Sequence, residues 1–248
     1  HKERYARHLM LEGLGEAGQL KLLKASVLVI GAGGLGSPAL YYLVAAGVGR
    51  VGIVDSDVVE LSNLQRQTVH STERVGLLKV DSAAITLKPL NPEVRLLTYP
   101  FRADADNITA LINEYDFVID ATDNFESKFL INDACVAARK AYSHGGILRF
   151  NGQTMTVIPG MSPCYRCIFP ESIEGEDAIA CSKAGVLGVL PGVIGTLQAT
   201  EAIKYLTDVG ELLTGRLLTY DSAALKFREI RVRRNPACPV CGESQSSP

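Results

Sequence analysis

The sequence lacks an excess of charge of either sign. Its 248 residues include 25 lysines and arginines and 27 aspartates and glutamates, which gives a formal net charge of −2. Nucleic acids and anionic membrane surfaces attract proteins through clustered positive charge, so this balance gives no electrostatic reason to expect either partner. The basic segment "FREIRVRR" is interpreted as the polar face of a strand.

Long apolar runs are also missing. The N-terminal segment "HKERYARHLM" is charged and has no apolar core of the kind found in secretory signals. The most apolar later stretch, "AGVLGVLPGVIGTLQA", is shorter than the roughly 20 residues that span a bilayer and carries Pro191, so it predicts a buried helix. We therefore expect a soluble cytoplasmic protein, whose six cysteines are metal ligands, free thiols or catalysts rather than disulfides.

The order of the apolar segments predicts an α/β fold with a Rossmann-like, doubly wound, mostly parallel sheet. The strand-like segments "SVLVIG", "RVGIVD", "EVRLLTY" and "FVID" alternate with helical patterns near 35–46, 77–87, 105–113 and 124–140. The later segments "GQTMTVI", "RLLTYDS" and "KFREIRVRR" alternate as antiparallel strands do, and they are expected to extend the same sheet. A helical lead-in over residues 3–24, interrupted between Gly13 and Gly18, precedes the first strand.

The segment "VLVIGAGGLGSPALYYLVAAGVGRVGIVDSD", residues 27–57, predicts a phosphate-binding turn. Gly31, Gly33 and Gly36 fit the pattern G-x-G-x-x-G between a strand and a helix, which is the context that the motif requires. The first glycine permits a tight turn, the second lets the backbone approach a phosphate, and the third packs helix on strand. Asp55 ends the next strand, where an acid accepts hydrogen bonds from a ribose. A nucleotide is indicated, without a decision between a dinucleotide and ATP; a turn with no ligand is the structural alternative.

The loop after Asp55 gathers charged and amide side chains, namely Asp57, Asn63, Gln65 and Arg66, with Lys79 following. A nicotinamide used for hydride transfer needs a flat apolar slot, whereas cations and amides suit a polyphosphate whose leaving group must be stabilised. For Arg66 or Lys79 taken alone, a solvated surface charge is the simpler interpretation.

Two further aspartates, Asp120 and Asp123, follow the strand-like segment "FVID". They are expected at the carboxyl edge of the sheet, where ligands of open α/β sheets bind. A carboxylate beside a triphosphate is a natural ligand of Mg²⁺. On local pattern alone, Asp123 is equally suited to be the N-cap of the helix that follows.

Four cysteines form two pairs, Cys164 with Cys167 in "CYRC" and Cys238 with Cys241 in "CPVC". This spacing is typical of a four-cysteine zinc site, in which the metal would hold the C-terminal segment against the body of the protein. Four thiolates leave no open coordination position, so such a zinc would be structural. Unrelated free thiols and a redox pair are the alternatives. Cys135, within an apolar helical pattern, is interpreted as a buried inert thiol.

Six segments together resemble the MoeB/ThiF (HesA/MoeB/ThiF) group of ubiquitin-activating-like adenylyltransferases: "RYARH", "GAGGLGSPALYYLVAAGVGRVGIVDSDVVELSNLQRQ", "VGLLKVDSA", "INDACVAA", "PCYRCIFP" and "NPACPVCG". The resemblance covers nearly the whole chain. It implies ATP-dependent adenylation of the C-terminal glycine of a small ubiquitin-like sulfur-carrier protein ending in Gly-Gly, for molybdopterin, thiamine or thiolated-tRNA biosynthesis. Residues 1–248 would form one adenylation domain, with a helical lead-in at 1–24, a nucleotide-binding half at 25–150 and a carrier-binding, zinc-stapled half at 151–248.

The resemblance also implies a nucleotide site made of Gly31, Gly33, Gly34, Gly36, Asp55, Asp57, Asn63, Arg66, Lys79 and Asp123. The glycines would face the phosphates, and Asp55 would accept hydrogen bonds from the ribose. Asn63, Arg66 and Lys79 would contact the triphosphate. Asp123 would hold Mg²⁺.

Two more residues receive roles from the resemblance. Arg7, in the segment "RYARH", would reach into the site of the other subunit of a homodimer. Cys181, in the loop segment "SIEGEDAIACSKAGVLG", would attack the acyl-adenylate, as a cysteine at this place does in some members. A spectator thiol is the alternative for Cys181, because adenylation itself needs no nucleophilic side chain. A separate protein would then donate the sulfur.

Three alternative functions are distinguished by simple observations. A nicotinamide-dependent oxidoreductase would use the same glycines, but it leaves the NLQRQ segment and the cysteine pairs without a role. A non-catalytic scaffold that only binds the carrier would fail to bind ATP. An enzyme that activates a carboxylate on a tRNA base is disfavoured by the mild acidity of the chain.

Overall fold

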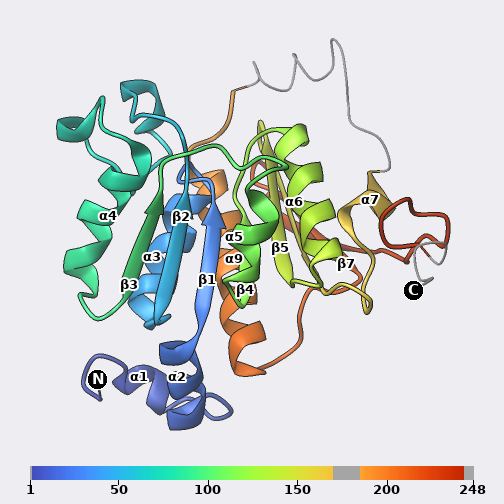
Figure 1. Cartoon of the computed structure of the whole chain (residues 1–248), viewed down its shortest axis with the longest axis horizontal. Helices are drawn as coiled ribbons and strands as arrows, with labels where there is room; N and C mark the ends of the chain where they lie inside the picture. Colours follow the sequence, from blue (N-terminus) through green and yellow to red (C-terminus); the bar gives the residue numbers. More distant parts are fainter. Residues whose placement is uncertain (1, 170–184, 243–248) are drawn as a thin grey trace.

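The computed structural model of the chain describes residues 2–169 and 185–242. These residues contain an eight-stranded sheet in the order β3-β2-β1-β4-β5-β6-β7-β8, with helices packed on both of its faces (Figure 1). The strands are β1 (Ser26–Ile30), β2 (Arg50–Val54), β3 (Arg95–Tyr99), β4 (Phe117–Asp120), β5 (Tyr142–Leu148), β6 (Asn151–Val157), β7 (Arg216–Asp221) and β8 (Lys226–Arg231).

The sheet changes character at β5. The five strands from β3 to β5 pair in parallel, whereas β5, β6, β7 and β8 pair antiparallel. The sequence reflects this difference, because "SVLVI" in β1 is buried at every position and "KFREIR" in β8 is exposed at every position. Continuous apolar runs are expected for parallel strands that are covered on both faces. The predicted fold class, a doubly wound parallel sheet extended by antiparallel strands, is confirmed.

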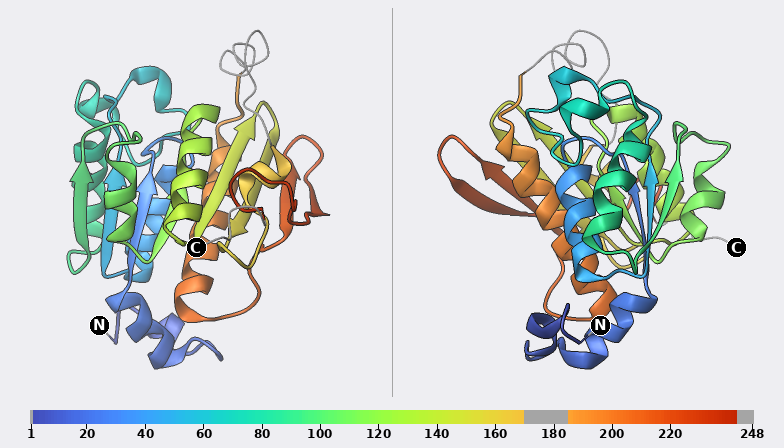
Figure 2. Two further views of the ribbon diagram at one scale, coloured as in Figure 1. Left: turned by 45° about the vertical axis from the view of Figure 1, so that its right-hand side comes forward. Right: turned by 90° about the vertical axis from the view of Figure 1, so that its left-hand side faces the viewer.

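Two layers of helices enclose the parallel strands (Figures 1 and 2). One layer contains α3 (Gly36–Ala46), α4 (Lys79–Leu90) and α9 (Val189–Thr207), and the other contains α5 (Ile108–Asn113), α6 (Phe125–Ala137) and α7 (Tyr165–Ile168). Successive side chains of a strand point to opposite faces. Val27 and Val29 of β1 therefore enter the core beneath α3 and α9, while Leu28 and Ile30 enter the core beneath α5 and α6.

The N-terminal helices α1 (Ala6–Leu9) and α2 (Gly15–Lys24) lie beyond the amino ends of the parallel strands (Figure 1). The predicted interruption from Gly13 to Gly18 is too long, because α2 begins at Gly15 and includes Gly18. Gly13 takes a φ of 87°, so the chain reverses direction there and the helix can start two residues later.

The apolar segment around Pro191 forms α9, as predicted. Pro191 lies in the first turn of the helix, where a missing N–H breaks no intrahelical hydrogen bond. Ile194, Ala199 and Ala202 of α9 are buried against the sheet. Within residues 2–169 and 185–242, this helix and all others are too short or too polar to pass through a bilayer.

Candidate functional site

The glycine-rich turn connects β1 to α3 at the carboxyl ends of the parallel strands. Gly31 takes a φ of 105°, which residues with a side chain rarely adopt. A Cβ atom on Gly36 would lie 1.9 Å from the carbonyl oxygen of Gly31. In the described part of the chain no side chain caps the start of α3, and the N–H of Gly36 has no partner, whereas the N–H of Ser37 donates to the carbonyl of Gly33 at 2.9 Å. The N–H of Gly36 is thus available to a ligand. The turn therefore has the close approach and the helix start that a phosphate requires.

Hydrogen bonds hold this turn on both sides of Ala32. The N–H of Ala32 donates to the carboxylate of Asp55 at 2.8 Å, and its carbonyl accepts from Nε2 of His70 at 2.9 Å. Nδ1 of His70 in turn lies 2.9 Å from the hydroxyl of Ser82 on α4. A carbonyl can only accept, so Nε2 carries the proton and Nδ1 accepts from Ser82. Burial lowers the pKa of His70, which is consistent with this neutral form.

The predicted loop residues lie around the same turn. Lys79, the first residue of α4, is buried, and its ammonium lies 2.8 Å from the carboxylate of Asp57. Asp55 accepts the N–H of Asp57 at 2.9 Å, and burial raises the pKa of Asp55. Three residues assigned to the site from sequence, Asp55, Asp57 and Lys79, are thus brought together beside the glycines.

The segment from η1 (Leu61–Asn63) to Gln67 covers the turn from the other side. A Cβ atom on Gly34 would lie 3.5 Å from Cγ of Arg66, so the arginine packs directly beside the turn. In the described part of the chain the Asn63 side chain forms two long hydrogen bonds of 3.4 Å: its Oδ1 accepts from the N–H of Glu60, and its Nδ2 donates to the hydroxyl of Ser62. Bonds of this length are weak, so the Asn63 amide is free to turn toward a ligand.

Gln67 is a site residue that was not assigned from sequence. It is 5% exposed, and its amide would lie 3.5 Å from a Cβ atom on Gly33. Its Oε1 atom has no hydrogen-bond partner in the described part of the chain. A buried polar atom without a partner is costly, so an orphan beside a phosphate turn fits a polar ligand. The only signal in the sequence is its place at the end of NLQRQ.

Asp123 follows β4 and presents an exposed carboxylate. Asn124, rather than Asp123, is the N-cap of α6, because the Asn124 side chain accepts from the N–H of Ser127 at 2.9 Å. Among the residues that the structure describes, none forms a hydrogen bond or ion pair with the Asp123 side chain. The capping interpretation of Asp123 is therefore wrong, and its carboxylate is available to a ligand.

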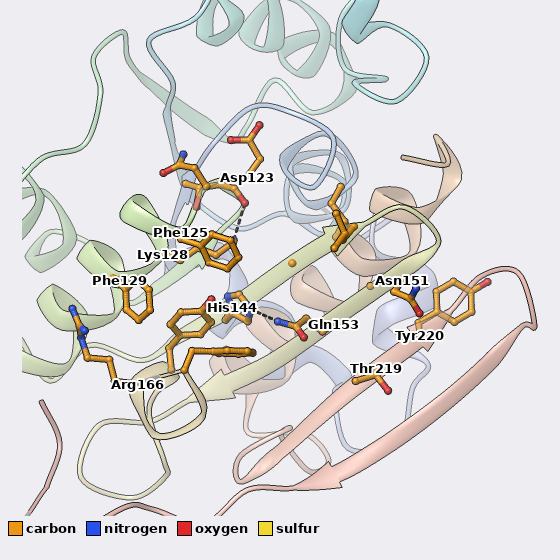
Figure 3. Close-up of a pocket in the computed structure, with 18 of the residues that line it drawn as sticks. Asp123, Phe125, Lys128, Phe129, His144, Asn151, Gln153, Arg166, Thr219 and Tyr220 are labelled. Atoms are coloured by element: carbon orange, nitrogen blue, oxygen red, sulfur yellow. Dashed lines mark hydrogen bonds between the residues drawn. The ribbon is translucent and has the colours of Figure 1, made fainter. Parts of the chain in front are cut away.

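A cavity of about 1040 Å³ begins at Asp123 and runs along the antiparallel part of the sheet (Figure 3). Aromatic rings from α6, α7 and the residues beside them form one wall, namely Phe125, Phe129, Tyr165 and Phe169. Gly146 of β5 and Gly152 of β6 line the opposite side. A Cβ atom on Gly146 would lie 3.3 Å from Gln153, which lines the cavity, so the bare backbone at Gly146 allows the close approach of an extended chain. A Cβ atom on Gly152 would instead lie 2.5 Å from Ile194 of α9, on the other face of the sheet. The cavity therefore has the size and lining of a peptide-binding channel that ends at Asp123.

A buried ionic cluster lies beneath this end of the cavity. The carboxylate of Asp120 is 3.2 Å from the ammonium of Lys128 and 3.1 Å from Nδ1 of His144. Burial opposes ionisation of Asp120, but the Lys128 charge and the His144 hydrogen bond outweigh it and lower the pKa to about 2. Burial lowers the pKa of His144, so the neutral ring donates its Nδ1–H to Asp120. Unlike Asp123, Asp120 is fully engaged by protein groups.

The four paired cysteines come together as predicted. All their sulfur atoms lie within 4.8 Å of one another, and the closest pairs are 3.6 Å (Cys164 to Cys238) and 3.4 Å (Cys167 to Cys241). A disulfide would bring two sulfurs to about 2 Å, whereas tetrahedral zinc with Zn–S bonds of about 2.3 Å separates its sulfurs by about 3.8 Å. The cluster thus fits a tetrahedral thiolate metal site. Cys135 is buried, and burial raises the pKa of its thiol, as expected for an inert core residue.

Two residues assigned from the resemblance are not part of this arrangement. Arg7 is exposed on α1, which lies at the opposite end of the sheet from the glycine-rich turn (Figure 1). The Arg7 of a chain is therefore remote from that chain's own turn. Cys181 lies outside the described residues.

A phosphate-type turn at the carboxyl ends of parallel strands, beside a free carboxylate and a large cavity, is typical of an α/β nucleotide-binding protein. The chain belongs to the ThiF family, whose family model matches residues 5–240.

Several relatives match over nearly the whole chain. The SAMP-activating enzyme E1 of Haloferax volcanii is 48% identical over 97% of this chain and 89% of its own. The sulfur carrier protein adenylyltransferase of Thermus thermophilus is 48% identical over 97% of this chain and 91% of its own. The adenylyltransferase and sulfurtransferase MOCS3 of Anopheles gambiae is 46% identical over 97% of this chain, which spans only 55% of that relative.

Solved structures support the fold. The crystal structure of E. coli MccB with ATP superposes with a TM-score of 0.84 at 25% identity, covering 98% of this chain and 75% of MccB. The crystal structure of MccB with MccA-N7isoASN superposes with a TM-score of 0.86 at 24% identity, covering 98% of this chain and 75% of MccB. At this identity the match shows a similar fold.

The packing of the turn leads to a stability prediction. Gly36→Ala should lower the free energy of unfolding by about 1–3 kcal/mol, because the added methyl group collides with the Gly31 carbonyl and the backbone must shift. Gly192→Ala is the matched control: it lies in α9, and no atom is within 4 Å of its Cβ position. Urea denaturation measures the free energy of unfolding of both variants. Equal values for Gly36→Ala and Gly192→Ala would contradict the close packing of the turn.

Proposed function

We propose that this protein is an adenylyltransferase that uses ATP to activate the C-terminal glycine of a small ubiquitin-like sulfur-carrier protein. The observation that carries the proposal is that the glycine-rich turn packs against Ala121 and Thr122, next to the free carboxylate of Asp123 and the cavity that begins there. The names of two relatives that match over most of their length, a SAMP-activating enzyme E1 and a sulfur carrier protein adenylyltransferase, support it. Residues 1–248 then act as a single adenylation domain.

ATP would lie with its phosphates on the turn from Gly31 to Gly36. Each oxygen of Asp55 accepts one backbone N–H and keeps capacity for a ribose hydroxyl. The unpartnered Oε1 of Gln67 supports this placement, because a bound nucleotide would supply a partner. Arg66, Lys79 and Asn63 would contact the triphosphate.

Asp123 would hold Mg²⁺ together with phosphate oxygens, since Mg²⁺ prefers one or two carboxylates plus phosphates to a cage made only of protein. The bound ion would neutralise part of the phosphate charge. The exposure of Asp123 and the absence of a partner for it within residues 2–169 and 185–242 support this role.

In the proposed reaction a carboxylate oxygen of the carrier's terminal glycine attacks the α-phosphorus of ATP. The bond between the α-phosphorus and the bridging oxygen breaks, and pyrophosphate leaves. No general base is needed, because a C-terminal carboxylate is already ionised at neutral pH. Lys79 and Arg66 would balance the charge that develops on pyrophosphate, and the ion pair with Asp57 keeps the Lys79 ammonium in position.

The carrier's tail would enter along the cavity, with its last residues against the backbone of Gly146. A terminal Gly-Gly sequence has no side chains, so it suits a passage between bare backbone and aromatic rings. Lys226 and Arg228 line the same cavity and would supply positive charge for the carrier surface or the tail, whereas Arg166, which also lines it, is paired with Asp133 at 2.7 Å.

The assembly would be a homodimer in which Arg7 of the partner subunit completes the site. The remoteness of α1 from its own chain's turn supports an action in trans. The four cysteines would hold a structural Zn²⁺, and a separate protein would donate the sulfur. Thiolates that must stay reduced favour the cytoplasm as the compartment.

The catalytic proposal predicts carrier-dependent exchange of label between pyrophosphate and ATP, because adenylation is reversible. Asp123→Ala should lower the exchange rate by about a hundredfold or more, since the lost carboxylate acts mainly on the transition state. Its melting temperature should not change, because Asp123 has no partner in the described part of the chain. Asp106→Ala, another exposed aspartate, is the control. Undiminished exchange in the Asp123 variant would remove this residue from the mechanism.

Action of Arg7 in trans predicts recovery of activity on mixing. Arg7→Ala and Asp123→Ala chains are each expected to be inactive. Random assortment of equal amounts should restore about a quarter of the wild-type exchange rate, because half of the dimers are mixed and each has one intact site. Native mass spectrometry verifies that mixed dimers form. Mixed dimers without activity would exclude the trans role.

The zinc proposal predicts one zinc ion per chain by elemental analysis, lost in Cys238→Ala and kept in Cys135→Ala. Chelation should raise hydrogen exchange in α7 and residues 235–242 far more than in the glycine-rich turn, because the metal joins segments that are distant in sequence. Zinc that persists after all four ligands are replaced would place the metal elsewhere.

A further inference from the structure

We propose that Lys128 is a positioning residue that fixes Asp123 by tying the turn between β4 and α6 to β5. The inference rests on the proposed function, in which Asp123 is the ligand of Mg²⁺. Lys128 itself makes no contact with ATP in this account. Figure 3 shows its side chain below Asp123, among the residues that line the cavity.

The three N–H donors of the Lys128 ammonium are all used within the protein. Nζ donates to the carbonyl of Thr122 at 2.7 Å and to the carbonyl of Gly145 at 2.5 Å. The carboxylate oxygens of Asp120 lie 3.2 and 3.4 Å away. The side chain is only 7% exposed. The Lys128 ammonium thus binds two backbone carbonyls, one before α6 and one in β5, and one buried carboxylate.

Asp120 completes the hold on the turn. Its Oδ1 atom accepts from the N–H of Thr122 at 3.1 Å and from the Thr122 hydroxyl at 2.6 Å. Thr122 is therefore fixed at its N–H and its hydroxyl by Asp120 and at its carbonyl by Lys128. Asp123 is the next residue, and no described group bonds to its side chain. Lys128 and Asp120 therefore fix the backbone from which the Asp123 carboxylate projects.

The hydrogen bond to the Gly145 carbonyl also ties Lys128 to the strand that lines the proposed carrier channel. Gly145 precedes Gly146, which lines the cavity where the carrier's tail would end. His144, on the same strand, donates to Asp120 and accepts from Gln153 on β6 at 3.3 Å. The Lys128 ammonium therefore sets the distance between the turn that carries Asp123 and the part of β5 on which the reacting carboxylate would lie.

The test compares Lys128→Met and Lys128→Arg in the full chain. At saturating ATP and carrier, the Mg²⁺ concentration for half-maximal exchange should rise about tenfold or more in Lys128→Met, as when a supporting partner of a metal ligand is lost. In Lys128→Arg this Mg²⁺ concentration should stay close to the wild-type value, because a guanidinium keeps the positive charge and several hydrogen-bond donors. Affinity for metal-free ATP, measured by calorimetry, should not change in either variant, since Ala32, Asp55 and His70 do not contact Lys128.

A double variant, Lys128→Met with Asp120→Asn, separates positioning from charge balance. It removes the unpaired carboxylate that Lys128→Met alone would leave buried. We expect it to melt at a higher temperature than Lys128→Met alone and still to need more Mg²⁺ than the wild type, because the Thr122 and Gly145 carbonyls have both lost their donor. A normal Mg²⁺ requirement in Lys128→Met or in the double variant would overturn the proposal.

The failure of the proposed function gives a different result. Wild-type protein that shows no exchange with any Gly-Gly-ended carrier would contradict the adenylyltransferase. The gain in ATP affinity on adding Mg²⁺ then still tests Lys128: the gain should be present in the wild type and Lys128→Arg and absent in Lys128→Met. An equal gain in all three would reject the positioning role.

Discussion

The shape of the nucleotide turn depends on the backbone of one residue, Ala32. Its N–H is held by Asp55 at the end of β2, and its carbonyl is held by His70, which is anchored on α4 through Ser82. Because α4 begins with Lys79, the same bonds that fix the turn also fix the cation beside it. Gly31 and Gly36 make this closeness sterically possible. The glycine-rich turn and the charged groups beside it, Asp55 and Lys79, are therefore held together by the same bonds.

The second half of the site is built where the sheet changes from parallel to antiparallel. β4 ends at the buried Asp120 and delivers Asp123 to the edge, while β5 and β6 supply the floor of the cavity. The cysteine cluster supports the opposite wall: Tyr165, between two of the cysteines, packs on His144 with ring centroids 4.6 Å apart. The proposed zinc would therefore shape the carrier channel without contacting the nucleotide.

Local patterns explain what could be predicted from the sequence. Strands such as "SVLVI", the glycine spacing and the paired cysteines are set by a few neighbouring residues, and all three are found as expected. The capping role was ambiguous because Asp123 and Asn124 both suit an N-cap, and only the backbone geometry selects Asn124. Lys128 reaches the carbonyl of Gly145, 17 residues along the chain, and no local pattern carries that contact. The orphaned amide of Gln67 likewise becomes visible only in three dimensions.

The central claim is that a carrier carboxylate attacks the α-phosphorus of ATP, and isotope transfer tests it most directly. A carrier whose C-terminal carboxylate contains heavy oxygen would be incubated with ATP, Mg²⁺ and the protein, and the product cleaved with hydroxylamine at the acyl carbon. The account predicts AMP that contains one heavy oxygen, because the attacking oxygen stays on phosphorus when the acyl bond breaks. AMP without heavy oxygen, formed at the same rate, would show that water attacks ATP and would contradict the account.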